Sequence, residues 1–305
     1  MKTGLQLRNR TLRVILCISL LLAVTTMALA DEYRYSKVPA PWWWNVVEPL
    51  GINNKGVVFG TVYLIIFVYP IPIADIRRGF LYNGWLYIEL LPPGCTDAMA
   101  SDMNESGVVV GSGLWSDRTD TWKGFIYNDG VYTELLPPGW FSATANAIND
   151  SGAVVGYGYD VTGTNKGFIY NDGVYTKLLP PGCIETYATG INESGMVIVN
   201  GYDRTGTYKG FIYSDGTYTE LLPQGWFSAT ANAINDSGTV VGYGYDFTTG
   251  TYKGFIYSNG TYTELLAPGY TDAIPADINE NGVVVGRYKF IPQLYREKGF
   301  IALPK

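Results

Sequence analysis

Short hydrophobic runs separated by polar, glycine-containing turns recur along almost the whole chain. In one copy of the pattern the runs are residues 143–148, 153–159, 167–170 and 174–179. They are rich in β-branched and aromatic residues, and none keeps a helical period over a useful length, so each is typical of a strand. The Asn-Asp-Gly sequence at 171–173 favours a tight hairpin, because such turns need positive φ. The pattern predicts four antiparallel strands per copy and an all-β protein.

The four-strand pattern occurs six times at a nearly constant period. Its Gly-Phe pair begins at Gly79, Gly124, Gly167, Gly210, Gly254 and Gly299, at spacings of 45, 43, 43, 44 and 45 residues. Its Ile-Asn-x-x-Gly turn, in which Met103 once replaces the isoleucine, places an asparagine at Asn53, Asn104, Asn149, Asn192, Asn235 and Asn279. A fixed period of this length, divided into short strands, is typical of a propeller or a solenoid.

The two ends of the repeated region each hold half of a copy. Residues 35–38 are a fourth-strand piece with no Gly-Phe strand before it, and residues 299–303 are a third-strand piece with nothing after it. In an open solenoid both would be exposed edges, whereas in a ring they pair and the edge disappears. We therefore predict one domain over residues 31–305: a six-bladed β-propeller of four-stranded repeats of about 43 residues, whose last blade is closed by the N-terminal strand.

Residues 1–30 have the three-part layout of a secretory signal. Four basic residues precede a mostly apolar run at 14–30, which ends in the small-residue sequence Ala28-Leu29-Ala30. This layout predicts cleavage after Ala30 and a secreted, extracellular or periplasmic protein. The alternative is an uncleaved N-terminal anchor, although the run is short for a membrane span.

Charge and residue usage exclude several classes of function. Removing the leader takes away four of the 21 basic residues and none of the 27 acidic residues. The remaining chain therefore has a net charge of about −10. An acidic chain has no electrostatic basis for binding nucleic acid. We expect the excess charge to serve solubility. We also expect the protein to be a monomer. The chain has no histidine, which excludes His-dependent triads and most zinc sites. We expect no cofactor and no bound metal.

Two cysteines, Cys95 and Cys183, follow the same Leu-Leu-Pro-Pro-Gly sequence in alternate repeats. Two equivalent positions with a whole repeat between them do not approach within the roughly 7 Å between Cα atoms that a disulfide needs. We therefore expect two free, partly buried thiols.

The repeat resembles that of the HAF family of extracellular repeat proteins. The matching residues are Gly124 to Tyr127 and the later Ile-Asn-x-x-Gly-x-Val-Val-Gly sequence at 148–156, and the resemblance extends over nearly residues 35–303. The departure is that Gly-Phe stands where the family has His-Ala-Phe. The resemblance implies secretion and a repeat fold, and it implies no established biochemical activity.

Propeller topology places the loops after the second and fourth strands on one face, opposite the tight turns. Loops on a rigid scaffold are where binding residues concentrate, and exposed aromatic rings stack on sugars or anchor proteins. The candidate ligand-binding residues on this face are Trp42, Trp43, Trp44, Trp140, Phe141, Trp226, Phe227 and Tyr270. The alternative is that the tryptophans cover the seams between blades.

The first and last repeats depart from the others and are neighbours in a ring. The first has a longer apolar segment from Tyr63 onward, and the last has a basic, aromatic one from Arg287. If these segments are exposed loops, they predict a partner-contact patch. The alternative is longer strands that pack at the closure. The candidate contact residues are Tyr63, Ile65, Phe67, Arg287 and Tyr288.

Four aspartates begin loops of the type Asp-x-Thr-Gly-Thr: Asp117, Asp160, Asp203 and Asp246. A carboxylate that bonds its own loop backbone explains them, with calcium binding as the alternative. The sequence contains no unrepeated pair of acids for glycosidase chemistry. We predict a non-catalytic binding or surface-interaction module for a carbohydrate or an extracellular protein. The alternatives are a carbohydrate-active enzyme, a glycosidase or lyase on a sialidase-like propeller, and a purely structural exoprotein.

Overall fold

The computed structural model describes residues 37–68, 71–116, 120–266, 270, 272–290 and 296–304, without the side chains of 66–75 and 289–298. By contacts the chain divides into residues 1–39 and 40–305, and the second unit holds all the strands. The described residues form strands and turns, with no helix, which confirms the all-β prediction. They accordingly contain no helix long and apolar enough to cross a membrane.

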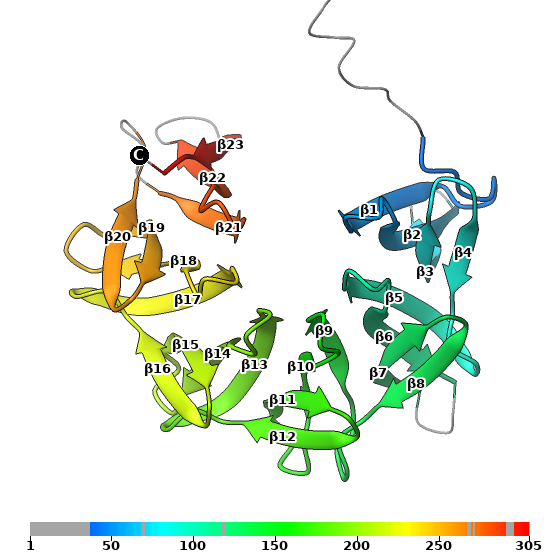
Figure 1. Cartoon of the computed structure of the whole chain (residues 1–305), viewed down its shortest axis with the longest axis horizontal. Helices are drawn as coiled ribbons and strands as arrows, with labels where there is room; N and C mark the ends of the chain where they lie inside the picture. Colours follow the sequence, from blue (N-terminus) through cyan, green and yellow to red (C-terminus); the bar gives the residue numbers. More distant parts are fainter. Residues whose placement is uncertain are drawn as a thin grey trace, which may run out of the picture. The chain divides into compact units, whose positions relative to one another are not determined.

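Six antiparallel sheets follow one another in chain order, which Figure 1 shows from blue to red. Sheet one is β1 (Val46–Ile52), β2 (Val58–Val68), β3 (Ile71–Tyr82) and β4 (Tyr87–Leu90). Sheet two is β5 (Cys95–Met103), β6 (Val109–Trp115), β7 (Thr121–Asn128) and β8 (Val131–Leu135). Sheet three is β9 (Thr144–Ile148), β10 (Val154–Tyr159), β11 (Asn165–Asn171) and β12 (Val174–Leu178). Sheet four is β13 (Cys183–Ile191), β14 (Val197–Asp203), β15 (Tyr208–Ser214) and β16 (Thr217–Leu221). Sheet five is β17 (Trp226–Ile234), β18 (Val240–Asp246), β19 (Thr251–Ser258) and β20 (Thr261–Leu265), and sheet six is β21 (Ile274–Ile278), β22 (Val284–Phe290) and β23 (Arg296–Ala302).

The predicted turn chemistry is present in the structure. The hairpin between β11 and β12 places Asp172 at a φ of 46° and Gly173 at 84°. Aspartate and glycine tolerate this left-handed region, which two-residue hairpins require. The strands of sheet three lie within two residues of the predicted ones. Turn residues and alternation therefore determine the four-strand unit locally.

Neighbouring sheets pack through one repeated pair of residues. The phenylalanine of each Gly-Phe pair in sheets one to five is buried, as is the last leucine of the fourth strand in sheets one to four. Leu90 of sheet one, for example, shares a cluster with Ala98, Ala100 and Phe125 of sheet two. The glycine before the phenylalanine allows this approach, because a Cβ at Gly124 would lie 3.3 Å from the main-chain nitrogen of Ala145 in sheet three.

A ladder of side-chain hydrogen bonds joins the sheets along the face of the tight turns. In sheets two to five the asparagine of the Ile-Asn-x-x-Gly turn donates its Nδ2 to the carbonyl oxygen of the asparagine in the next sheet, whereas the buried Asn53 Nδ2 of sheet one has no partner among the described residues. The bonds run from Asn104 to Asn149 (3.2 Å), Asn149 to Asn192 (3.2 Å), Asn192 to Asn235 (3.0 Å) and Asn235 to Asn279 (3.1 Å). A second ladder involves the residue that follows each asparagine, whose main-chain amide donates to the side-chain carboxylate of the corresponding acid in the next sheet. The bonds run from Asn54 to Glu105, Glu105 to Asp150, Asp150 to Glu193, Glu193 to Asp236 and Asp236 to Glu280.

The first and last sheets expose apolar positions that the inner sheets bury. Ile52 of sheet one is 68% exposed, whereas the equivalent Ile148 is 6% exposed. Ile301 of sheet six is 69% exposed, whereas the equivalent Ile212 is 5% exposed. Sheet six has three strands among the described residues. Of the segment predicted to complete it, residues 35 and 36 lie outside the described residues and residues 37 and 38 are not in a strand, so closure stays a prediction.

Candidate functional site: the loop face of sheets three to five

Two classes of loop meet on the face opposite the tight turns. In sheet three the connection before β9 contacts the end of β10, where the Phe141 amide donates to the Tyr159 carbonyl at 2.8 Å. In sheet two the Ser116 amide likewise donates to the Gly94 carbonyl at 3.0 Å. In sheet five the rings of Phe227 and Phe247 meet edge to face, with centroids 5.0 Å apart. The loop face therefore gathers side chains from both connections of a repeat.

Large hydrophobic side chains are exposed on this face in three consecutive sheets. They are Phe141, Tyr159 and Val161 of sheet three, Ile184 and Tyr202 of sheet four, and Phe227, Phe247 and Tyr252 of sheet five. We call these eight residues the aromatic face. Rings beneath them link the sheets, since Tyr157 of sheet three lies 5.0 Å from Tyr187 of sheet four.

The two repeated tryptophans turn inward from the aromatic face. Trp140 packs edge-on against the buried Phe168, and Trp226 does the same against Phe255, both with ring centroids 6.0 Å apart. Both indoles are half-buried. This geometry favours the alternative in which they support the blades, and it leaves Phe141 and Phe227 as the exposed members of each predicted pair.

The three consecutive tryptophans take different environments. Trp42 and Trp43 are exposed and meet edge to face at 5.7 Å. Trp44 is half-buried and receives the Arg78 guanidinium over its ring at 5.9 Å, a cation–π contact. The last predicted aromatic, Tyr270, stacks on Tyr288 at 4.0 Å.

The longer segment of the first repeat is strand rather than loop up to residue 68, which agrees with the alternative of longer strands. It extends β2 and β3, which pair over eleven positions. The Tyr63 hydroxyl donates to Glu48 Oε2 at 2.8 Å, and the side chain of Asn45 bonds both main-chain groups of Ile65. β-branched and aromatic residues, which dominate this segment, favour strands. The Phe67 side chain lies outside the described residues.

The segment at Arg287 is likewise part of strand β22 rather than a loop. Arg287 is exposed and Tyr288 is half-buried. Tyr288 stacks on Phe300 of β23 at 5.0 Å and on Tyr270. Residues 291–295 lie outside the described residues.

The loop aspartates bind their own loops, as predicted, where they are described. Asp203 Oδ1 accepts the amides of Thr205 and Thr207 at 2.8 and 3.1 Å. Asp246 accepts the Thr248 amide and pairs with Lys253 Nζ at 3.0 Å. Asp117 lies outside the described residues. Within the part of the chain that the structure describes, no three acids or cysteines converge as metal ligands do.

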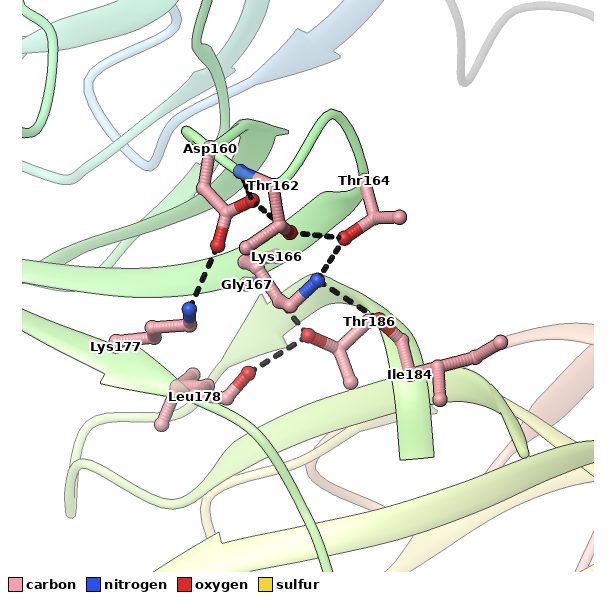
Figure 2. A network of polar contacts seen from close by, with 9 residues as sticks. All are labelled: Asp160, Thr162, Thr164, Lys166, Gly167, Lys177, Leu178, Ile184 and Thr186. Atoms are coloured by element: carbon pink, nitrogen blue, oxygen red, sulfur yellow. Dashed lines mark hydrogen bonds and ion pairs between the residues drawn. The ribbon is translucent and has the colours of Figure 1, made fainter. Parts of the chain in front are cut away.

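Sheet three differs from the others in this loop (Figure 2). Asp160 accepts the Thr162 amide at 2.9 Å and pairs with Lys177 Nζ at 2.7 Å. Burial opposes ionisation of Asp160, but the bonds from Lys177 and Thr162 hold its pKa well below the usual range. The buried Lys166 instead donates to Thr164 and to the Ile184 carbonyl, and burial lowers its pKa. The polar groups of this network bond one another, so we assign the network a structural role.

Cys95 and Cys183 are both free. Burial raises the pKa of the Cys95 thiol to about 11, and burial also raises that of Cys183. A thiol of raised pKa is a poor nucleophile. The geometry thus agrees with two free, partly buried thiols.

No family model and no curated protein matches the chain, so the resemblance to HAF repeats stays a prediction. Among solved structures, the chain is similar to the β-propeller domain of the Trilobed protease from Pyrococcus furiosus, at 11% identity and a TM-score of 0.55, over 85% of this chain and 81% of that chain. It is also similar to the acylaminoacyl peptidase of Pyrococcus horikoshii, at 12% identity and a TM-score of 0.53, over 81% of this chain and 44% of that chain. A third similarity is to a prolyl endopeptidase, at 11% identity and a TM-score of 0.56, over 85% of this chain and 43% of that chain.

The chain spans less than half the length of the last two structures. At such identities the similarity shows the fold alone. The chain is therefore an all-β repeat protein of the β-propeller type, with six antiparallel sheets among its described residues.

Proposed function

We propose that this protein is a secreted, non-catalytic binding module that holds a carbohydrate or an extracellular protein on its aromatic face. The observation that carries the proposal is the exposure, on a stiff scaffold, of Phe141 before sheet three and of Phe227 and Phe247, whose rings contact each other in sheet five. Aromatic rings supply large contact area at low entropic cost, and they stack on sugar rings. Localisation outside the cytoplasm, after cleavage near Ala30, belongs to the same proposal.

The aromatic face contributes little to folding. Phe141 and Phe227 are exposed, whereas the neighbouring Trp140 and Trp226 pack on the blade cores. Hydrophobic groups that a fold leaves on one face are typical of a binding surface. We therefore assign them to a ligand.

Catalysis has weaker support. The repeated glutamates of the fourth strands pair with lysines of their own sheets: Glu134 with Lys123, Glu220 with Lys209 and Glu264 with Lys253. Such pairs form the solvated outer edge of a sheet and resemble no acid–base pair across a cleft. A carbohydrate-active enzyme and a purely structural exoprotein therefore remain the alternatives.

The number of blades and the closure of the ring belong to the proposal as well. We take the six sheets as the six blades of one monomeric propeller that the N-terminal strand closes. The near-constant repeat period and the exposed apolar ends of sheets one and six support it.

The test is binding to a glycan array and to extracellular protein extracts, with a triple variant Phe141→Ala/Phe227→Ala/Phe247→Ala. The matched control is Trp85→Ala, because Trp85 is 97% exposed but lies in the β3–β4 turn on the opposite face. We expect the triple variant to lose at least tenfold in affinity and the control to bind as the wild type does. Equal binding by all three proteins, or binding by none, would overturn the proposal.

A further inference from the structure

One row of side chains in sheet four brings an acid and two phenols together at the loop face. Glu185 of β13 pairs directly with Tyr202 of β14, and Tyr202 pairs directly with Tyr208 of β15. Residues that face each other across neighbouring strands lie on the same side of a sheet, so the three side chains form one row, which we call the sheet-four row. The rings of Tyr202 and Tyr208 lie 4.6 Å apart.

The sheet-four row lies at the loop end of the side that packs on sheet five. On this side Gly210 of β15 lies so close to sheet five that an added Cβ would be 3.1 Å from the Ala231 nitrogen. The side chain of Asn200, two residues before Tyr202, bonds both main-chain groups of Ala231 at 2.9 Å. These contacts fill the seam between the two sheets below the row, whereas Tyr202 is 40% exposed and the other two members are half-buried. The row therefore remains accessible from the loop face.

Glu185 does not make the bond that its equivalents in other sheets make. Two of these equivalents, Asp97 and Asp272, each accept a main-chain amide of the preceding sheet at 2.9 Å. Within the described part of the chain Glu185 accepts one hydrogen bond, from the Tyr187 hydroxyl at 3.2 Å, and no cation pairs with it. A carboxylate can accept about four hydrogen bonds, so Glu185 has acceptor positions that the fold does not use.

The two phenols of the row are hydrogen-bond donors that the fold does not use either. Among the described residues, neither the Tyr202 nor the Tyr208 hydroxyl has a hydrogen-bond partner, and neither hydroxyl is fully buried. Burial raises the pKa of Tyr208, and so do four neighbouring phenols: Tyr202, Tyr187, Tyr243 and Tyr157. Tyr208 therefore stays protonated and able to donate, among phenols that come from sheets three, four and five.

Two lysines beside the row are already bound within the fold. Lys209 of β15 pairs with Glu220 at 3.2 Å. Lys166 of sheet three donates to the carbonyl oxygen of Ile184, the residue before Glu185, at 2.8 Å (Figure 2). An anionic ligand group at the row would be repelled by the Glu185 carboxylate, whereas hydroxyl groups would donate to it.

We propose that the sheet-four row binds one residue of a neutral saccharide. Adjacent hydroxyl groups of the sugar donate to Glu185, the two phenol hydroxyls bond further sugar oxygens, and the exposed ring of Tyr202 packs on the apolar side of the sugar. Aromatic side chains with a few convergent polar groups are the usual composition of a small-molecule site. The inference rests on the binding function proposed above and narrows its ligand class to neutral carbohydrate.

The test uses a glycan array that carries neutral and sialylated forms of the same chains, followed by calorimetry with the neutral glycan that binds best. We expect the wild type to bind neutral forms at least tenfold more strongly than sialylated forms. Glu185→Gln should lose at least tenfold in affinity for the neutral glycan, and Tyr208→Phe, which removes only a hydroxyl, at least threefold. The matched control is Glu134→Gln, which removes the same charge from β8 of sheet two and should bind as the wild type does.

Urea denaturation of each variant checks folding, and Tyr208→Phe keeps the test valid if Glu185→Gln does not fold. Wild-type affinity in both variants, a preference for sialylated forms, or binding of proteins alone would overturn the inference. If the triple phenylalanine variant loses binding while Glu185→Gln and Tyr208→Phe keep it, the inference fails and the proposed function stands. Absence of any binding by the wild type overturns both.

Discussion

The side-chain amide of Asn149 donates to the main-chain carbonyl oxygen of Asn192, 43 residues later and in the next sheet, at 3.2 Å. The Asn149 Oδ1 atom meanwhile accepts the Ala153 amide of its own turn at 2.9 Å. One buried residue thus closes a turn and joins two sheets.

Replacing Asn149 by alanine should reduce the free energy of unfolding by about 1–3 kcal/mol, because it leaves the buried Ala153 amide unpaired and removes one of the two bonds to the Asn192 carbonyl, which keeps the Gly195 amide at 3.0 Å. Urea denaturation measures the change. The control Asn128→Ala, at the exposed hairpin after β7, should change it by less than about 0.5 kcal/mol. Equal effects of the two substitutions would contradict the joining role of Asn149.

Gly124→Ala should destabilise the protein by about 1–3 kcal/mol, because the new Cβ would lie 3.1 Å from the Leu135 Cβ and 3.3 Å from the Ala145 nitrogen. The same exchange at Gly190, in strand β13, meets nothing closer than the Ile198 Cδ1 at 3.6 Å and should be neutral or slightly stabilising. Thermal unfolding of both variants checks the pair. A stable Gly124→Ala protein would show that the sheets tolerate a wider separation.

The free energy of unfolding should fall as the pH rises from about 4 to 6, because Asp102 loses its proton at a higher pH in the folded state than in the unfolded state. Burial raises its pKa to about 6, although the amides of Ile148 and Met103 favour the charged form. The folded state then binds more protons than the unfolded state, whose aspartates titrate near 4, and stability falls through this window. Urea midpoints measured between pH 4 and 7 should show this slope in the wild type. Asp102→Asn should remove it, and an unchanged slope in the variant would assign the effect to another group.

Lys177→Glu should change the free energy of unfolding by less than about 1 kcal/mol, because it gives sheet three the same charged residues that sheet five has at the equivalent positions. There Lys253 pairs with both Asp246 and Glu264, each at 3.0 Å. In the variant Lys166 should turn from the Ile184 carbonyl to the new carboxylate and to Asp160. A crystal structure of the variant and its urea midpoint check this. Loss of more than about 2 kcal/mol would mean that the Lys177–Asp160 pair is not interchangeable with that arrangement.

The repeat units followed from the sequence because their determinants are local. Alternation, the Asn-Asp-Gly hairpins and the proline after the fourth strand locate the strands to within a few residues. The asparagine of the Ile-Asn-x-x-Gly turn was visible as a repeat, but its bond to the next sheet depends on how two sheets pack. Periodicity along the chain does not contain that information.

The site was less predictable for the same reason. The sequence places Trp140 and Phe141 side by side, and packing alone decides that the indole turns inward and the phenyl ring outward. The other six residues of the aromatic face were missed because they sit at strand ends and loops whose partners come from other connections: Tyr159, Val161, Ile184, Tyr202, Phe247 and Tyr252. A search for apolar residues next to the Asp-Thr loops would have found Phe247.

The asparagine and acid ladders run along the tight turns, while the aromatic face lies on the opposite side of each sheet. The hydrogen bonds that hold the sheets together and the exposed apolar side chains of the loop face therefore belong to different residues of the repeat. Phe141 or Phe247 can be replaced without disturbing the bonds between neighbouring sheets, so the surface chemistry of this face can vary while the fold is kept.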